Sequence, residues 1–118
     1  MIAGLDHIQL AVPRGGEAVC RAFWVDLVGL TEIEKPAALA SRGGLWLALG
    51  RSELHLGVET PFEPAKKAHP GFLTPDIGAL ANRLAINGST VTWDDTIPGR
   101  KRFFSEDPFG NRLEFLEE

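Results

Sequence analysis

Three histidines and one glutamate make up the candidate chemistry of this chain. His7, His55 and His69 are all the histidines of the sequence, and Glu114 stands near its end. Imidazole and carboxylate ligands together suit zinc, nickel, cobalt, iron or manganese, whereas magnesium and calcium prefer shells made of oxygen alone. The residue types therefore predict one divalent metal ion, bound by His7, His55, His69 and Glu114.

Strand periodicity predicts that these side chains point away from the core. Residues 5–12 carry apolar side chains at alternate positions, which leaves His7 and Gln9 on the opposite face. Two leucines flank His55, and a leucine and a phenylalanine flank Glu114, so the same parity applies there. Gln9, which shares a face with His7, is a candidate substrate-binding residue.

The same order of elements, βαβββ, is predicted twice. The first half contains a strand at 5–12, a helix at 17–28 and strands at 30–34, 44–49 and 53–59. The second half contains a strand at 68–75, a helix at 77–86 capped by Asp76, and strands at 89–94, 102–105 and 112–116. The breaker-rich linker 60–64 separates them.

The spacing of the four residues supports an internal repeat. His7 precedes His55 by 48 residues (55 − 7), and His69 precedes Glu114 by 45 (114 − 69). Two modules related by a pseudo-two-fold would bring the four side chains together. We therefore expect an α+β fold in which two tandem βαβββ modules, about 1–60 and about 68–118, form one domain. Its mixed sheet would enclose a partly open, barrel-like cavity with the helices outside.

Composition excludes several classes of partner. The 118 residues, 44% of them hydrophobic, suffice for one compact core. A net charge of −4 gives no basic surface for nucleic acid or an anionic membrane, so a small molecule is the expected partner. No apolar stretch resembles a signal peptide or a membrane span, which predicts a soluble cytoplasmic protein. The only cysteine, Cys20, is expected to be buried in a helix and not catalytic.

Four segments of the chain resemble the vicinal-oxygen-chelate superfamily, which includes glyoxalase I, fosfomycin-resistance thiol transferases, bleomycin-resistance proteins and extradiol dioxygenases. They are residues 5–8, residues 23–30 with Val-Gly-Leu at their end, residues 69–72, and residues 102–114. In the last segment an Asp-Pro-Phe-Gly-Asn turn precedes Arg-Leu-Glu, which is the most specific feature. The resemblance covers nearly the whole chain.

The resemblance implies roles for the candidate residues. His7, His69 and Glu114 would be metal ligands, and His55 stands where some members place a fourth ligand, commonly glutamate. Such short chains pair as homodimers, with each site often built from the first half of one subunit and the second half of the other. Whether the modules pair within one chain or between two stays open.

The leading hypothesis is a metal-dependent lyase, isomerase or oxygenase acting on a small vicinal-oxygen compound. His55 and Glu114 are the candidate catalytic residues, with His55 serving as fourth ligand or as base. The chain has no tyrosine, which argues against the extradiol dioxygenase and fosfomycin branches, and His55 itself argues against a true glyoxalase I. Trp46 and Trp93 are candidates for an aromatic wall, with core packing as the alternative.

Two further interpretations remain open. Arg102, within the basic run 100–102, is a candidate substrate-binding residue or part of a solvated loop. The whole chain resembles, alternatively, bleomycin-resistance members that bind a ligand in a dimer cleft without metal. A structural or regulatory dimer that has kept the fold and lost activity is the third possibility.

Overall fold

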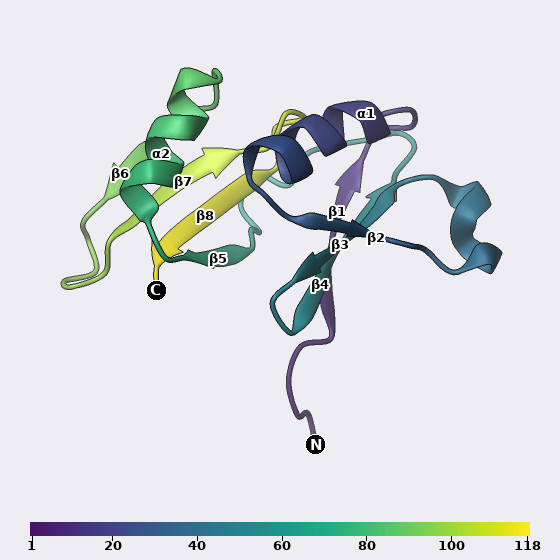
Figure 1. Ribbon diagram of the computed structural model, residues 1–118, viewed down its shortest axis with the longest axis horizontal. Coiled ribbons are helices and arrows are strands. Elements are labelled where there is room, and N and C mark those ends of the chain that lie inside the picture. Colours follow the sequence, from purple (N-terminus) through teal and green to yellow (C-terminus); the bar gives the residue numbers. More distant parts are fainter. The chain divides into compact units, whose positions relative to one another are not determined.

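The computed structural model describes residues 1–118, which divide into two compact units, Met1–Pro64 and Ala65–Glu118 (Figure 1). The first unit contains β1 (His7–Val12), α1 (Glu17–Cys20), η1 (Arg21–Leu27), β2 (Thr31–Ile33), η2 (Ala37–Arg42), β3 (Leu45–Leu49) and β4 (Ser52–Val58). The second contains β5 (Gly71–Thr74), α2 (Ile77–Ile86), β6 (Thr92–Asp94), β7 (Arg102–Glu106) and β8 (Arg112–Glu117). The predicted α+β fold with two tandem βαβββ modules is confirmed.

Each unit holds one mixed four-stranded sheet. The strand orders are β1-β4-β3-β2 and β5-β8-β7-β6, so the first strand of each unit lies beside the last. These two strands pair in parallel, while the other pairs are antiparallel. The parallel pairing joins the segments that are farthest apart in each unit, and it brings the predicted histidine positions close to the last strand.

One face of the first sheet packs against the continuous helix formed by α1 and η1, which lies above the sheet in Figure 1. Alternate residues of three strands supply this buried face, namely Leu10, Val12, Leu45, Leu47, Leu54 and Leu56. Burying each such leucine stabilises the fold by about 1.5–3 kcal/mol relative to exposing it. The opposite face is left for polar side chains.

The buried face of the first helix differs from the predicted one. In the predicted helix 17–28, apolar residues four apart, such as Val19 and Phe23, should share one buried face. Val19 is instead 45% exposed, and Cys20 and Trp24 are buried with Phe23. The Val28 N–H donates to the Phe23 carbonyl at 2.8 Å, a bond that spans five residues. This wider turn changes which residues share a face. The expected burial of Cys20 is confirmed.

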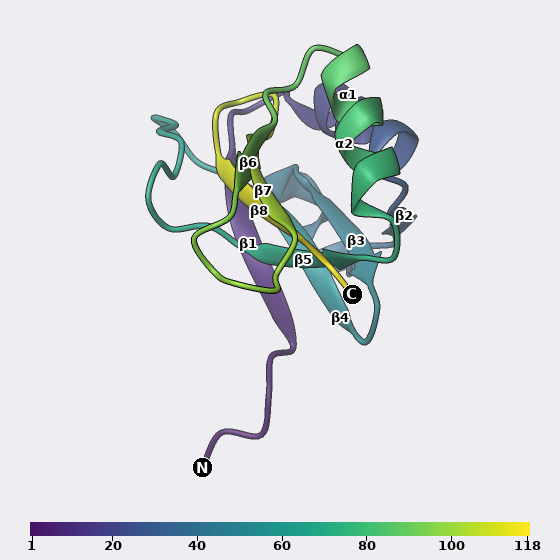
Figure 2. The ribbon, with the colours of Figure 1, turned by 90° about the vertical axis from the view of Figure 1, so that its left-hand side faces the viewer.

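The core of the second unit combines aromatic rings with one face of α2. Phe72, Phe103 and Phe115 form a row of rings with neighbouring centroids 5.2–5.5 Å apart. The helix α2 lies along this face of the sheet (Figure 2) and buries Ile77, Ala81 and Leu84. As predicted, Asp76 caps the helix, because its carboxylate accepts the Ala79 N–H at 3.0 Å.

Two predicted boundaries shift, and one element was not predicted. The strand expected from residue 68 begins at Gly71, so His69 precedes it, because Pro70 has no N–H to donate to a strand partner. The strand expected from residue 89 begins at Thr92. The short 3₁₀ turn η2 was missed, since its run of small residues carries no strand or helix periodicity.

The Asp-Pro-Phe-Gly-Asn turn is fixed by its own side chains. Asp107 accepts hydrogen bonds from the Phe109 and Asn111 backbone N–H groups, both at 2.9 Å. The Asn111 amide donates to Asp107 at 2.8 Å, and its oxygen accepts the Ala65 N–H at 2.9 Å. Both polar side chains are buried and satisfied, so they hold the start of β8 and therefore the register of Glu114.

None of the helices has the length and the apolar run needed to cross a bilayer.

We expect Gly44→Ala to be strongly destabilising. Gly44 has φ +81°, and a Cβ there would overlap the backbone carbonyl oxygen of Leu56. Gly50→Ala is the matched control, because Gly50 also has positive φ, +56°, but faces open space. The control should lower the free energy of unfolding by about 1 kcal/mol and Gly44→Ala by about 3 kcal/mol or more, measured by urea titration. Equal losses would contradict the predicted overlap.

Candidate functional site

The polar face of the first sheet opens onto a hollow of about 690 Å³. Side chains from β1, β3 and β4 line it, among them His7, Gln9, Trp46, Glu53 and His55. All five lie on the face opposite the buried leucines, as strand parity requires. The sequence-predicted residues His7, Gln9, Trp46 and His55 are thus brought together within this unit.

Three of these side chains form a stack of rings. The His55 ring lies between Trp46, at 3.9 Å and an interplanar angle of 3°, and His7, at 4.1 Å and 17°. His55 is only 5% exposed, so the stack and the sheet enclose it. Ring contacts of this kind restrict the imidazole to one orientation.

A carboxylate is bonded to each of the two imidazoles. Nδ1 of His7 lies 2.9 Å from an Asp6 carboxylate oxygen, and Nε2 of His55 lies 2.8 Å from Glu53. A carboxylate accepts, so in each ring the bonded nitrogen carries the hydrogen, and the other nitrogen keeps its lone pair. The nitrogen available to a ligand is therefore Nε2 in His7 and Nδ1 in His55.

The second unit pairs His69 with Glu114. Nε2 of His69 lies 2.9 Å from Oε1 of Glu114, and its Nδ1 lies 2.9 Å from the Lys67 carbonyl oxygen. A carbonyl oxygen only accepts, so Nδ1 carries a hydrogen. A separation of 2.9 Å between Nε2 and a carboxylate oxygen is that of a charge-assisted hydrogen bond, in which Nε2 also carries a hydrogen; a metal ion bound to both atoms would replace that hydrogen.

Arg102 holds the other oxygen of Glu114. Its guanidinium donates to Glu114 Oε2 and to Asp94 Oδ1, both at 2.9 Å. Burial raises the pKa of Glu114, but hydrogen bonds from Arg102 and His69 outweigh it, and the pKa lies below its ordinary value. Glu114 is therefore an oriented carboxylate at neutral pH.

The ring of Phe104 fills the space beside this pair. The His69 ring meets it edge-on at 5.5 Å, and the guanidinium carbons of Arg102 and Arg112 lie 5.1 and 4.2 Å from its centroid. Cations near an aromatic face are electrostatically favoured. Phe104 thus fixes the side chains around Glu114 from one side of the sheet.

The two units place corresponding residues at the same register position. In each, a last-strand residue, His55 or Glu114, lies opposite an aromatic residue of the antiparallel neighbour, Trp46 or Phe104. On its other side this last-strand residue pairs with Gln9 or Gly71 of the parallel first strand, and a histidine, His7 or His69, stands two residues earlier in the chain. The internal repeat predicted from spacing therefore has a structural counterpart.

The remaining predicted residues are placed as follows. Trp93 lies on the face opposite Glu114, with its ring 5.2 Å from Phe103, and is 54% exposed. Arg102 is engaged by two carboxylates. Neither unit by itself gathers three histidine, cysteine, aspartate or glutamate side chains in a group able to hold a metal ion. The four-ligand ion stays a prediction.

Four partners of the predicted site residues were missed from the sequence. Asp6, which is bonded to His7, is its neighbour in the chain. Glu53 stands two residues before His55, so the period of two that identified His55 could have indicated it. Asp94 contacts Arg102 only through the pairing of β6 with β7, and the Lys67 carbonyl reaches His69 through a local turn. Neither of these contacts leaves a signal in sequence periodicity.

Both the sequence and the fold match known proteins. A model of the Glyoxalase/Bleomycin resistance protein/Dioxygenase superfamily matches residues 4–115. The chain is 45% identical to a protein from Bacillus anthracis assigned to the glyoxalase family, with a TM-score of 0.95 over 100% of this chain and 97% of that one. No curated protein matches the sequence.

Two more distant structures share the fold alone. A lactoylglutathione lyase from Agrobacterium tumefaciens is 19% identical, with a TM-score of 0.74 over 98% of this chain and 94% of that one. TnmS3, an antibiotic binding protein from Streptomyces sp. CB03234, is 22% identical, with a TM-score of 0.75 over 98% and 96%. The same fold thus serves a lyase and a binding protein.

We expect Arg102→Gln to raise the pKa of Glu114. The substitution removes a hydrogen bond and a positive charge that lower this pKa, while the burial that raises it remains. Carbon-13 NMR of the glutamate carboxyl groups across a pH titration measures the shift. Arg100→Gln is the control, because Arg100 is exposed and makes no ion pair. A Glu114 titration unchanged by Arg102→Gln would show that Arg102 does not govern it.

Proposed function

Because the chain belongs to the Glyoxalase/Bleomycin resistance protein/Dioxygenase superfamily, we propose that it is a metal-dependent enzyme acting on a small organic compound with two adjacent oxygens. The observation that carries the proposal is the His69–Glu114 pair. Nδ1 of His69 donates to the Lys67 carbonyl, so Nε2 is the nitrogen that would ligate a metal after losing its hydrogen, and Arg102 orients Glu114.

The donor atoms fit a divalent ion. Nε2 of His69 lies 2.9 Å from Oε1 of Glu114, and an imidazole with a carboxylate is a donor set that zinc and related divalent ions would take. Lys67 and Arg102 would hold the two ligands in place, as outer partners do in known metal sites.

His7 is the third ligand that we propose. Its Nδ1 is bonded to Asp6, and its side chain is 42% exposed, so Nε2 is accessible. The same ion would bind His7 from the first unit and the His69–Glu114 pair from the second, in the same chain or in a homodimer partner. The two units would then act as modules of one domain.

We assign His55 the role of base in place of fourth ligand. A lone pair lies in the plane of its imidazole, and the His7 and His55 planes are nearly parallel with centroids 4.1 Å apart. One ion at bonding distance does not lie in both planes, so the two rings do not ligate it together in this arrangement. Glu53 orients His55 through Nε2, which leaves Nδ1 to accept a proton from a substrate in the hollow.

The metal, when bound, would polarise the two substrate oxygens and stabilise negative charge that develops on them. Gln9 and Trp46 would contact the substrate in the hollow. Arg102 would act on Glu114 and would not bind the substrate, since both of its terminal nitrogens already donate to carboxylates. Trp93, on the other face of its sheet, would contribute packing to the second unit.

A metal-free binding protein is the second candidate. The aromatic wall beside Gln9 and the volume of the hollow favour it, because small-molecule sites typically enclose about 300–1,000 Å³ with few polar groups. A metal-free binding protein would not need Arg102 to orient Glu114 or the Lys67 carbonyl to orient His69. We therefore place it second.

Metal analysis tests the proposal. We expect the full-length, untagged protein to retain close to one equivalent of divalent metal after extensive dialysis, measured by plasma mass spectrometry. His7→Ala, His69→Ala and Glu114→Ala should each reduce the retained metal by about tenfold to a hundredfold or more. His55→Gln should retain it, because the base is not a ligand.

Glu106→Ala provides the control, since Glu106 is an exposed carboxylate at the end of β7. Metal-free wild-type protein that binds hydrophobic compounds would favour the second candidate. Mixing the His7→Ala and Glu114→Ala proteins adds one further distinction, because only a site shared between subunits regains metal in the mixture.

Metal retention should also depend on pH. An imidazole must be neutral to ligate, so protons compete with the metal, and retention should fall as the pH is lowered from neutral towards about 4. The pKa of Glu114 is lowered, so this carboxylate stays ionised over most of that range and the histidines govern the release. Dialysis at a series of pH values with metal analysis measures the curve. Full retention at about pH 4 would contradict a histidine site.

A further inference from the structure

Two positively charged side chains, Lys35 and Arg42, line the hollow of the first unit and have no role in the proposed reaction. We propose that its substrate is a planar organic anion, whose acidic group binds to Arg42 and whose flat part lies against Trp46. This inference names the class of substrate and rests on the proposed function only in calling the ligand a substrate. The charges and the shape of the hollow carry it.

The charges within the hollow are unequally satisfied. Both of the carboxylates that line it are bonded to imidazoles, Asp6 to His7 and Glu53 to His55. The guanidinium of Arg42 also lines the hollow, is exposed, and makes no hydrogen bond or ion pair. A hydrogen bond from a neutral imidazole leaves each carboxylate its charge, but it occupies one of its oxygens. Arg42 is therefore the charged group in the hollow whose hydrogen-bonding groups are all unused.

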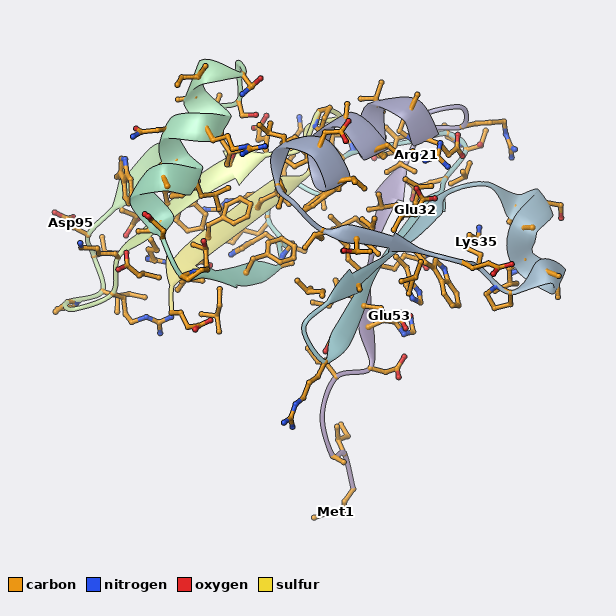
Figure 3. The ribbon with its side chains drawn as sticks, viewed as in Figure 1. Met1, Arg21, Glu32, Lys35, Glu53 and Asp95 are labelled. Atoms are coloured by element: carbon orange, nitrogen blue, oxygen red, sulfur yellow. The ribbon has the colours of Figure 1, made fainter.

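Lys35 supplies a second positive charge at the same rim. Its ammonium group donates to the Gly43 carbonyl, which ties the two ends of η2 together. An ammonium group has three donors, so two of them remain for a ligand. Figure 3 shows Lys35 between η2 and the strands of the sheet. Lys35 precedes η2 and Arg42 is its last residue, and both line the hollow.

Trp46 and Gln9 add an aromatic ring and an amide to the lining of the same hollow, and His55 covers one face of that ring. Trp46 is half-buried and lines the hollow, and its contact with His55 holds the indole in a fixed plane. Gln9 lies flat over Gly57, where a Cβ would collide with its amide, and that amide makes no hydrogen bond. A planar ligand stacks well on such a surface, and the free amide can donate to or accept from its polar groups.

The position of the acidic group follows from electrostatics. The face of an aromatic ring is electronegative, so an anionic group is disfavoured over Trp46 and favoured beside a guanidinium. Arg42 presents planar paired donors that match a carboxylate or a similar oxyanion. A ligand with its flat part on Trp46 and its anion at Arg42 satisfies both conditions.

Binding of a matched pair of probes tests the proposal. The probes are 2-naphthoate and the neutral 2-naphthamide, which share a ring system and differ in charge. Titration into the full-length protein as isolated, followed by isothermal calorimetry, gives both dissociation constants. We expect naphthoate to bind more tightly by about tenfold at low salt, and Arg42→Gln to abolish most of this preference.

Arg51→Gln is the matched control. It removes the same charge from an exposed arginine that does not line the hollow, so the preference should persist. Trp46→Leu should weaken both probes by a similar factor of about fivefold or more, because the stacking surface is lost. Equal affinity for the two probes, no binding of either, or the same effect of Arg42→Gln and Arg51→Gln would each overturn the proposal.

These results are separable from those on the metal. Metal content is measured on the same samples, and Arg42→Gln should leave it unchanged, because Arg42 is not among the proposed ligands. Loss of the naphthoate preference in Arg42→Gln with metal retained supports both proposals. A metal-free protein that still prefers naphthoate through Arg42 supports the anion site and contradicts the metal enzyme.

Discussion

The parallel pairing of the first and last strands in each unit is the constraint on which the site depends. In the first unit it sets Gln9 opposite His55, and in the second it sets Gly71 opposite Glu114. Side chains on a strand alternate faces, so a slip of one residue would turn His55 or Glu114 into the leucine-rich core. The buried leucines and phenylalanines on the other face oppose that slip, and packing of the core thereby fixes the chemistry of the open face.

Hydrogen bonds then decide which atoms of the site are reactive. Lys67 fixes the tautomer of His69 through a carbonyl oxygen, and Asp6 and Glu53 do the same for His7 and His55 through carboxylates. Arg102 holds Glu114 from behind and keeps it ionised. Each residue with a proposed chemical role is therefore oriented by a neighbouring residue that has no such role. This orientation reduces the entropy lost when a ligand binds.

The shared fold does not choose between catalysis and binding, since one similar structure is a lyase and another an antibiotic binding protein. The open faces of the two sheets of this chain carry different side chains. The second unit carries a histidine and a carboxylate in contact, whereas the first carries a stack of rings with a free cation at its rim.

The sequence by itself determined the order of the elements, the two βαβββ modules and the polar faces that carry His7, His55 and Glu114. Apolar residues recur with a period of two in the strands and of about four in the helices, so these elements can be found from the sequence alone. This approach failed at Val19, where the helix widens, and at η2, which has no periodicity.

Only the tertiary structure decided which groups meet. The stacking of His55 between Trp46 and His7, the capture of Arg102 by Asp94 and Glu114, and the location of Trp93 on the far side of its sheet all depend on register between strands. Register is set by the cooperative fit of many side chains across a sheet, and no single stretch of sequence contains it.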